Sequence, residues 1–148
     1  MGKVLIVYFS NTGRTRRMAE LIAEGIRFTE HQAVTKETSD METADDLAGY
    51  DGYIFGSPTH YRDIPGPMKA LLSLAAGADL QGKLAGTFGS YTHGGDAPGM
   101  ILETAESEFK MRPFDLGAFK LLEANVHTQE AMRACHDYGR TFAERLLG

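Results

Sequence analysis

The chain has 148 residues, a formal net charge of −5 and one cysteine, Cys135. With 43% hydrophobic and 24% charged residues, its composition is that of an ordinary globular protein, and we expect residues 1–148 to form one domain. The negative charge argues against nucleic-acid binding, and no apolar run approaches the ~20 residues that a membrane-spanning helix needs. The single cysteine excludes an internal disulfide. Together with the lack of an export signal at the N-terminus, it predicts a cytoplasmic location.

Patterns typical of strands and of helices alternate along the whole chain. The first apolar run, residues 4–9, is typical of a strand buried on both faces of a sheet. Further strands are expected at residues 32–37, 52–56, 83–89 and 119–123. Helices with one apolar stripe are expected at residues 14–28, at 65–75, from a cap at Asp96 until Pro113, and around 132–146. This alternation predicts an α/β fold with a doubly wound parallel sheet and right-handed crossovers.

A short hydroxyl-rich loop joins the first strand to the first helix. Its hydroxyl and backbone N–H groups face the positive end of the helix dipole, which is typical of a phosphate site. The loop lacks the lysine of a Walker A motif and the three glycines of a dinucleotide fingerprint, so we expect a terminal phosphate that is bound and not transferred. The alternative is that Ser10 and Thr12 only cap the helix. The loop consists of Ser10, Asn11, Thr12, Gly13, Arg14 and Thr15.

Two further loops, residues 56–65 and 89–96, leave central strands at the carboxyl edge of the predicted sheet, where open sheets bind ligands. They supply two tyrosines, two histidines and several small residues. A flat ring fits between such aromatic walls, although each tyrosine could instead pack at a strand end. The three loops together predict a site for flavin mononucleotide (FMN). The candidate residues of these two loops are Ser57, Pro58, Thr59, His60, Tyr61, Ser90, Tyr91, His93, Gly94 and Gly95.

On these motifs the chain resembles the flavodoxin-like superfamily over essentially its whole length. The resemblance implies one FMN-binding domain with a three-layer fold, in which helices cover both faces of a five-stranded parallel sheet of order 2-1-3-4-5. It also implies which groups hold the FMN phosphate. These are the hydroxyls of Ser10, Thr12 and Thr15 and the N–H groups of Asn11, Gly13 and Arg14.

The second and third loops resemble two branches of this superfamily. Gly56-Ser57-Pro58-Thr59, followed by Tyr61, is similar both to the flavodoxin domain of flavodiiron proteins and to the WrbA-like NAD(P)H:quinone oxidoreductases. Phe88-Gly89-Ser90-Tyr91 resembles short flavodoxins, whereas His93-Gly94-Gly95 resembles the quinone oxidoreductases. The chain has no tryptophan to cover the flavin, and it lacks the extra segment with which the WrbA-like enzymes build their tetramer.

Two functions remain open at this point. In the favoured one, the protein is an electron carrier that uses FMN, docks on a redox partner protein and is a monomer or dimer. In the alternative, it takes a hydride from NAD(P)H and passes it to a quinone, and His93 is the candidate catalytic residue. His93 could equally be an exposed loop residue. No residues have the spacing of a metal site, and the other histidines (His31, His127 and His136) are expected to face solvent.

Overall fold

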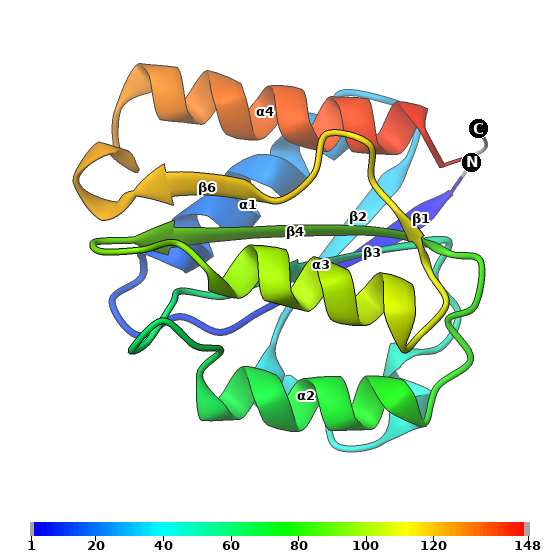
Figure 1. The fold of residues 1–148 in the computed structure, drawn as a ribbon. Coiled ribbons are helices and arrows are strands. Elements are labelled where there is room, and N and C mark those ends of the chain that lie inside the picture. Colours follow the sequence, from blue (N-terminus) through cyan, green and yellow to red (C-terminus); the bar gives the residue numbers. More distant parts are fainter. Residues whose placement is uncertain (1, 147–148) are drawn as a thin grey trace.

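The computed structural model describes residues 2–146, in which a parallel sheet lies between two layers of helices (Figure 1). The strands are β1 (Lys3–Tyr8), β2 (Gln32–Glu37), β3 (Gly52–Gly56), β4 (Leu84–Tyr91), β5 (Arg112–Pro113) and β6 (Phe119–Leu122). The helices are α1 (Arg14–Arg27), α2 (Gly66–Ala76), α3 (Ala97–Ser107) and α4 (Gln129–Glu144). The α/β class and the four expected helices are therefore confirmed, although the third is shorter than expected. None of the helices between residues 2 and 146 combines the length and apolar character needed to cross a membrane.

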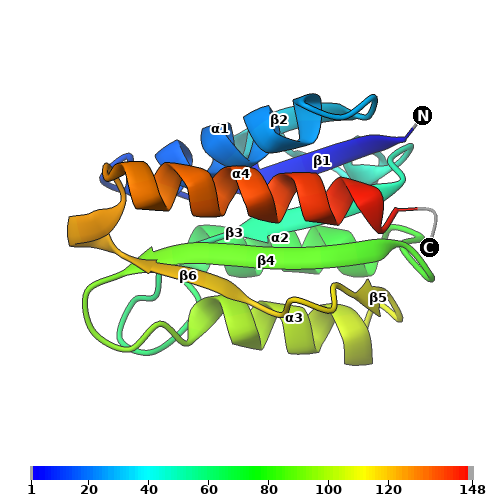
Figure 2. The same cartoon turned by 90° about the horizontal axis from the view of Figure 1, so that it is seen from above.

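Helices α1 and α4 cover one face of the sheet, and α2 and α3 cover the other (Figures 1 and 2). Successive side chains of a strand point to opposite faces. Accordingly, Val4 and Ile6 of β1 pack in the core on the α1–α4 side, while Leu5 and Val7 pack on the α2–α3 side. Burial on both faces is the reason why this strand is a continuous apolar run rather than an alternating one.

The strand order β2-β1-β3-β4-β5 confirms the predicted order 2-1-3-4-5. The register aligns the ends of β1 and β3, because Tyr8 pairs with Gly56, and Gly56 in turn pairs with Phe88 of β4, which continues to Tyr91. The loops that follow these three parallel strands therefore leave the same edge of the sheet. This edge carries all three loops that the sequence singled out.

The fifth position of the sheet differs from the prediction, because two short strands occupy it. Both β5 and β6 pair with β4. Between them the chain makes a turn in which the N–H of Gly117 donates to the carbonyl of Phe114 at 3.0 Å, and Gly117 has a φ of 75°. A two-residue strand is too short to show a periodic pattern, so β5 could not be recognised in the sequence.

The start of α3, directly after Asp96, was predicted correctly, but the capping side chain was not. Asp96 has helical backbone angles (φ −86°, ψ −26°) and its side chain makes no capping hydrogen bond, whereas a capping residue takes an extended conformation. The N–H of Ala97 instead donates to Oγ1 of Thr59, at 2.9 Å. The helix ends at Ser107, earlier than expected, and Lys110 follows with a left-handed φ of 57°.

Helices α1 and α4 approach each other closely at two glycines. A Cβ on Gly139 would lie 2.1 Å from the carbonyl oxygen of Ile22, and one on Gly25 would lie 2.2 Å from that of His136. His136 is half-buried in this contact, with Nε2 2.9 Å from Oε1 of Glu24, so the expectation that it faces solvent was wrong. The same holds for His31, whose Nδ1 accepts a hydrogen bond from the N–H of Gly2 at 2.8 Å, whereas His127 is exposed.

Candidate functional site

The loop of residues 10–15, called the phosphate loop below, turns the chain from β1 into α1. Gly13 precedes the helix with a φ of 88°, a conformation that favours glycine, although a Cβ there would meet no atom within 4 Å. Oγ of Ser10 accepts hydrogen bonds from the N–H groups of Gly13 at 3.1 Å and Arg16 at 3.3 Å. Ser10 thus caps the helix in this structure, which is the alternative role considered for it.

The start of α1 has unused hydrogen-bond donors. The N–H groups of Arg14 and Thr15 find no acceptor among residues 2–146, and the first turn of α1 contains no acidic side chain. The first N–H groups of a helix have no partner within it and carry the positive end of its dipole. This end of α1 is therefore suited to an anion.

Two buried hydroxyl groups lie beside these donors. Thr15, in the first turn of α1, and Ser90, near the end of β4, are 1% and 2% exposed, and their oxygens are 2.9 Å apart. Each hydroxyl has one hydrogen, and one of the two is used between them. The other hydrogen is left for a further acceptor in the space that both residues line.

The loop after β3 is held by several local contacts. The hydroxyl of Ser57 is buried and donates to the carbonyl of Pro58 at 2.8 Å. His60 and Asp63 exchange backbone hydrogen bonds at 2.9 and 2.8 Å, which forces Tyr61 and Arg62 into left-handed conformations (φ 50° and 61°) at the tip of the turn. Tyr61 is fully exposed at this tip.

Contacts between loops hold the edge of the sheet together. Nδ2 of Asn11, in the phosphate loop, lies 2.9 Å from Nε2 of His60. Gly89 lets the loop after β3 come close to β4, since a Cβ there would lie 2.0 Å from the carbonyl oxygen of Ser57. In the loop after β4, His93 is exposed and Gly95 packs against the ring of Tyr91.

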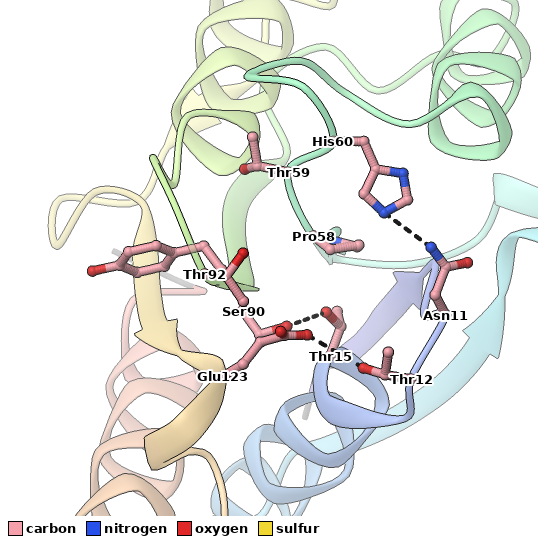
Figure 3. Close-up of a pocket in the computed structure, with 10 residues that line it drawn as sticks. Asn11, Thr12, Thr15, Pro58, Thr59, His60, Ser90, Thr92 and Glu123 are labelled. Carbon is pink, nitrogen blue, oxygen red and sulfur yellow. Dashed lines mark hydrogen bonds between the residues drawn. The ribbon is translucent and has the colours of Figure 1, made fainter.

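A cavity of about 190 Å³ lies between these loops (Figure 3). The predicted site residues that line it are Asn11, Thr12, Thr15, Pro58, Thr59, His60, Ser90 and Tyr91. The other predicted residues do not line it, namely Ser10, Gly13, Arg14, Ser57, Tyr61, His93, Gly94 and Gly95. Half of the candidate residues therefore line one cavity. The other half lie in the same three loops without lining it.

Two lining residues, Thr92 and Glu123, were missed by the sequence analysis. Glu123 directly follows β6, and its Oε1 lies 3.4 Å from Oγ1 of Thr12 and 4.0 Å from Nη1 of Arg14. Its position at the end of a predicted strand, on the same edge as the three loops, was the signal that could have found it. Within residues 2–146, no group of three or more His, Cys, Asp or Glu side chains is arranged to hold a metal ion.

Comparison with known proteins decides the family. The flavodoxin family model matches residues 6–137. The chain belongs to the flavodoxin family. It is 31% identical over 161 aligned residues to a flavodoxin of Aquifex aeolicus (strain VF5), with 97% of this chain and 86% of that relative covered. Flavodoxins bind FMN and transfer electrons through it.

Solved structures of flavodoxins agree with this assignment. An archaeal flavodoxin superposes with a TM-score of 0.89 at 29% identity, and 99% of each chain is covered. The Flv1 flavodiiron core from Synechocystis sp. PCC6803 gives a TM-score of 0.83 at 25% identity, with 98% of this flavodoxin but only 36% of that chain covered. These relatives lend no support to the NAD(P)H:quinone oxidoreductase alternative.

Proposed function

We propose that this flavodoxin holds the phosphate of FMN in the cavity at the start of α1. The observation that supports the assignment is the set of unused donors there, which are the N–H groups of Arg14 and Thr15 and one hydroxyl hydrogen of the Thr15–Ser90 pair. The exposed hydroxyl of Thr12 also lines the cavity, and in this structure it donates to Oε1 of Glu123 at 3.4 Å. Hydrogen bonds to a charged acceptor are the strong ones, so this donor set fits a phosphate dianion without a lysine or a metal ion.

The flat ring of the flavin is assigned to the space between the loops after β3 and β4. Pockets that enclose a whole ligand have volumes of roughly 300–1,000 Å³, and the cavity between the three loops measures only about 190 Å³. It therefore suits the polar end of the cofactor. Tyr61, Tyr91 and His93 are proposed to line the ring, and residues 1–148 to form one FMN-binding domain.

When bound, FMN supplies the redox chemistry, and the chain binds it, orients it and controls which molecules reach it. We place the protein among electron carriers that serve a redox partner protein, because flavodoxins of similar length match it almost from end to end. A cytoplasmic location and a monomeric or dimeric state remain predictions from the sequence.

An FMN titration of the apoprotein tests the assignment of the phosphate. The double variant Thr12→Ala/Thr15→Ala removes two hydroxyls and is expected to weaken FMN binding by roughly 1.5–3 kcal/mol for each lost bond to a charged group. Thr104→Ala is a matched control, since the exposed hydroxyl of Thr104 bonds only to the carbonyl of Met100 within α3. Unchanged FMN affinity in the double variant would place the phosphate elsewhere.

Anaerobic reduction of the FMN-loaded protein tests the carrier function. We expect no bleaching of the flavin band with NADH or NADPH and ready bleaching with dithionite. Fast bleaching by either nucleotide, reversed by a quinone, would instead identify an NAD(P)H-dependent oxidoreductase and make His93 the first residue to substitute.

A further inference from the structure

A carboxylate stands among the donors of the phosphate cavity. Glu123 opens the short 3-10 turn after β6, and its side chain points toward the phosphate loop (Figure 3). Its Oε1 accepts a hydrogen bond from the hydroxyl of Thr12 at 3.4 Å and lies 4.0 Å from Nη1 of Arg14. The side chain is only 25% exposed and lines the cavity. A full negative charge is thus placed where an anionic ligand is proposed to bind.

One of the two groups that Glu123 contacts, the hydroxyl of Thr12, is a donor that an anion in the cavity would use. The other, the guanidinium of Arg14, lies at the positive end of the α1 dipole but does not line the cavity. Among residues 2–146, Glu123 is the one acidic residue that lines the cavity. The remaining titratable side chains on its wall are those of His60, whose Nε2 is engaged with Asn11, and Tyr91.

We propose that Glu123 is an affinity- and specificity-determining residue of the FMN phosphate site. This inference rests on the proposed placement of the phosphate in the cavity. The carboxylate competes with the phosphate for the hydroxyl of Thr12, and it repels a dianion bound to the same loop. A flavin without a phosphate meets neither obstacle. Glu123 therefore lowers the preference of the site for FMN over riboflavin.

The contact of Glu123 with Arg14 is too exposed and too long to stabilise the fold appreciably. Their side chains are 25% and 39% exposed at a separation of 4.0 Å, and ion pairs of this kind contribute little to stability. Glu123→Gln keeps the size of the side chain and leaves an amide oxygen that accepts from Thr12. The variant thus removes the charge while retaining the shape, and we expect it to fold with unchanged stability.

The test compares the affinities of FMN and riboflavin for the apoprotein. Binding is measured by the quenching of flavin fluorescence. For Glu123→Gln we expect the dissociation constant of FMN to fall about tenfold, as for removal of a like charge a few ångströms from a dianion, while that of riboflavin stays the same. The gain should shrink at high ionic strength, because salt screens partly exposed charges. Glu106→Gln is the matched control. It makes the same change in net charge near the C-terminal end of α3, away from the loops, and should leave both affinities unchanged.

Four results would overturn the inference, the simplest being an unchanged dissociation constant of FMN in Glu123→Gln. Equal tightening of FMN and riboflavin would point to packing rather than charge, and weaker FMN binding would show that Glu123 supports the loop. An equal gain in FMN affinity in Glu106→Gln would show that the effect comes from the net charge of the protein and not from the position of Glu123. The proposed function fails separately. If FMN binds the wild type no more tightly than riboflavin and does not respond to Thr12→Ala/Thr15→Ala, the phosphate is misplaced; if FMN responds to that variant but not to Glu123→Gln, only the role of Glu123 is wrong.

Discussion

Oγ1 of Thr59 accepts a hydrogen bond from the backbone N–H of Ala97 at 2.9 Å. Thr59 belongs to the loop after β3, and Ala97 is the first residue of α3, which follows the loop after β4. One hydroxyl therefore caps a helix 38 residues further along the chain and fastens two of the three loops that border the cavity. Asp96, which directly precedes the helix in sequence, makes no capping hydrogen bond with its side chain.

Removal of this hydroxyl should destabilise the protein. Thr59→Val keeps the shape of the side chain but leaves the N–H of Ala97 without an acceptor, which costs about 1 kcal/mol, as for other lost helix caps. Urea unfolding followed by circular dichroism measures the change. Thr59→Ser retains the hydroxyl and should recover most of the stability. If Thr59→Val matches the wild type, then water or Asp96 takes over the cap.

The contact between α1 and α4 should not tolerate a side chain at Gly139. A Cβ there would lie 2.1 Å from the backbone oxygen of Ile22. Because the backbone cannot move aside locally, Gly139→Ala should lower the free energy of unfolding by about 3 kcal/mol. Gly99→Ala in α3 is the control, because nothing lies within 4 Å of its Cβ position. In this control the free energy of unfolding should rise by about 0.5–1 kcal/mol, because alanine has a higher helix propensity than glycine. Similar midpoints for both variants in thermal unfolding would contradict the close approach of the helices.

Cys135 should be unreactive in the folded protein. It is fully buried on α4, and burial raises the pKa of its thiol to about 12, although the positive charge of Arg17 opposes the shift. A thiol reagent such as DTNB at pH 8 should label it only after unfolding in urea, because the thiolate is the reactive form. Rapid labelling of the native protein would show that α4 opens easily.

The same shift predicts a loss of stability at high pH. The pKa of Cys135 is raised in the folded state, so above about pH 9 the unfolded chain releases the proton while the folded chain keeps it. The free energy of unfolding should then fall by about 1.4 kcal/mol per pH unit up to about pH 12. Cys135→Ala removes this contribution, so the difference between variant and wild type should change with pH by that amount. A pH-independent difference would contradict the shift.

Asp63 should titrate at unusually low pH. A hydrogen bond from Lys69 at 2.7 Å, supported by the backbone N–H of Ile64, lowers the pKa of its carboxyl below the ordinary value of an aspartate. The contact therefore stabilises the loop after β3 at neutral pH and is lost as the pH falls through this lowered value. Lys69→Met should raise the pKa of Asp63, as measured by NMR titration of its carboxyl carbon. An identical titration curve in the variant would show that the ion pair does not form in solution.

The sequence patterns alone predicted the alternating strands and helices and the edge that carries the candidate site, while the strand order came from the resemblance to the flavodoxin-like superfamily. The apolar run of β1 and the spacing of apolar residues in α1 and α4 indicate which side chains are buried. This is because the hydrophobic pattern of a strand or helix reflects which of its faces contacts the core. The phosphate loop was found for a similar reason. Its strand–loop–helix arrangement is local in sequence, and the donors at the start of a helix follow from backbone geometry alone.

The tertiary structure decided which side chains share a space. Glu123 meets Thr12 across 111 residues and Thr15 meets Ser90 across 75, and no periodicity or spacing encodes such pairs. The cap of α3 was assigned to Asp96 because a sequence shows only neighbours along the chain, whereas the hydroxyl of Thr59 arrives from another loop. Local backbone preferences set the elements, but the partners of a polar group depend on how the whole sheet brings strand ends together.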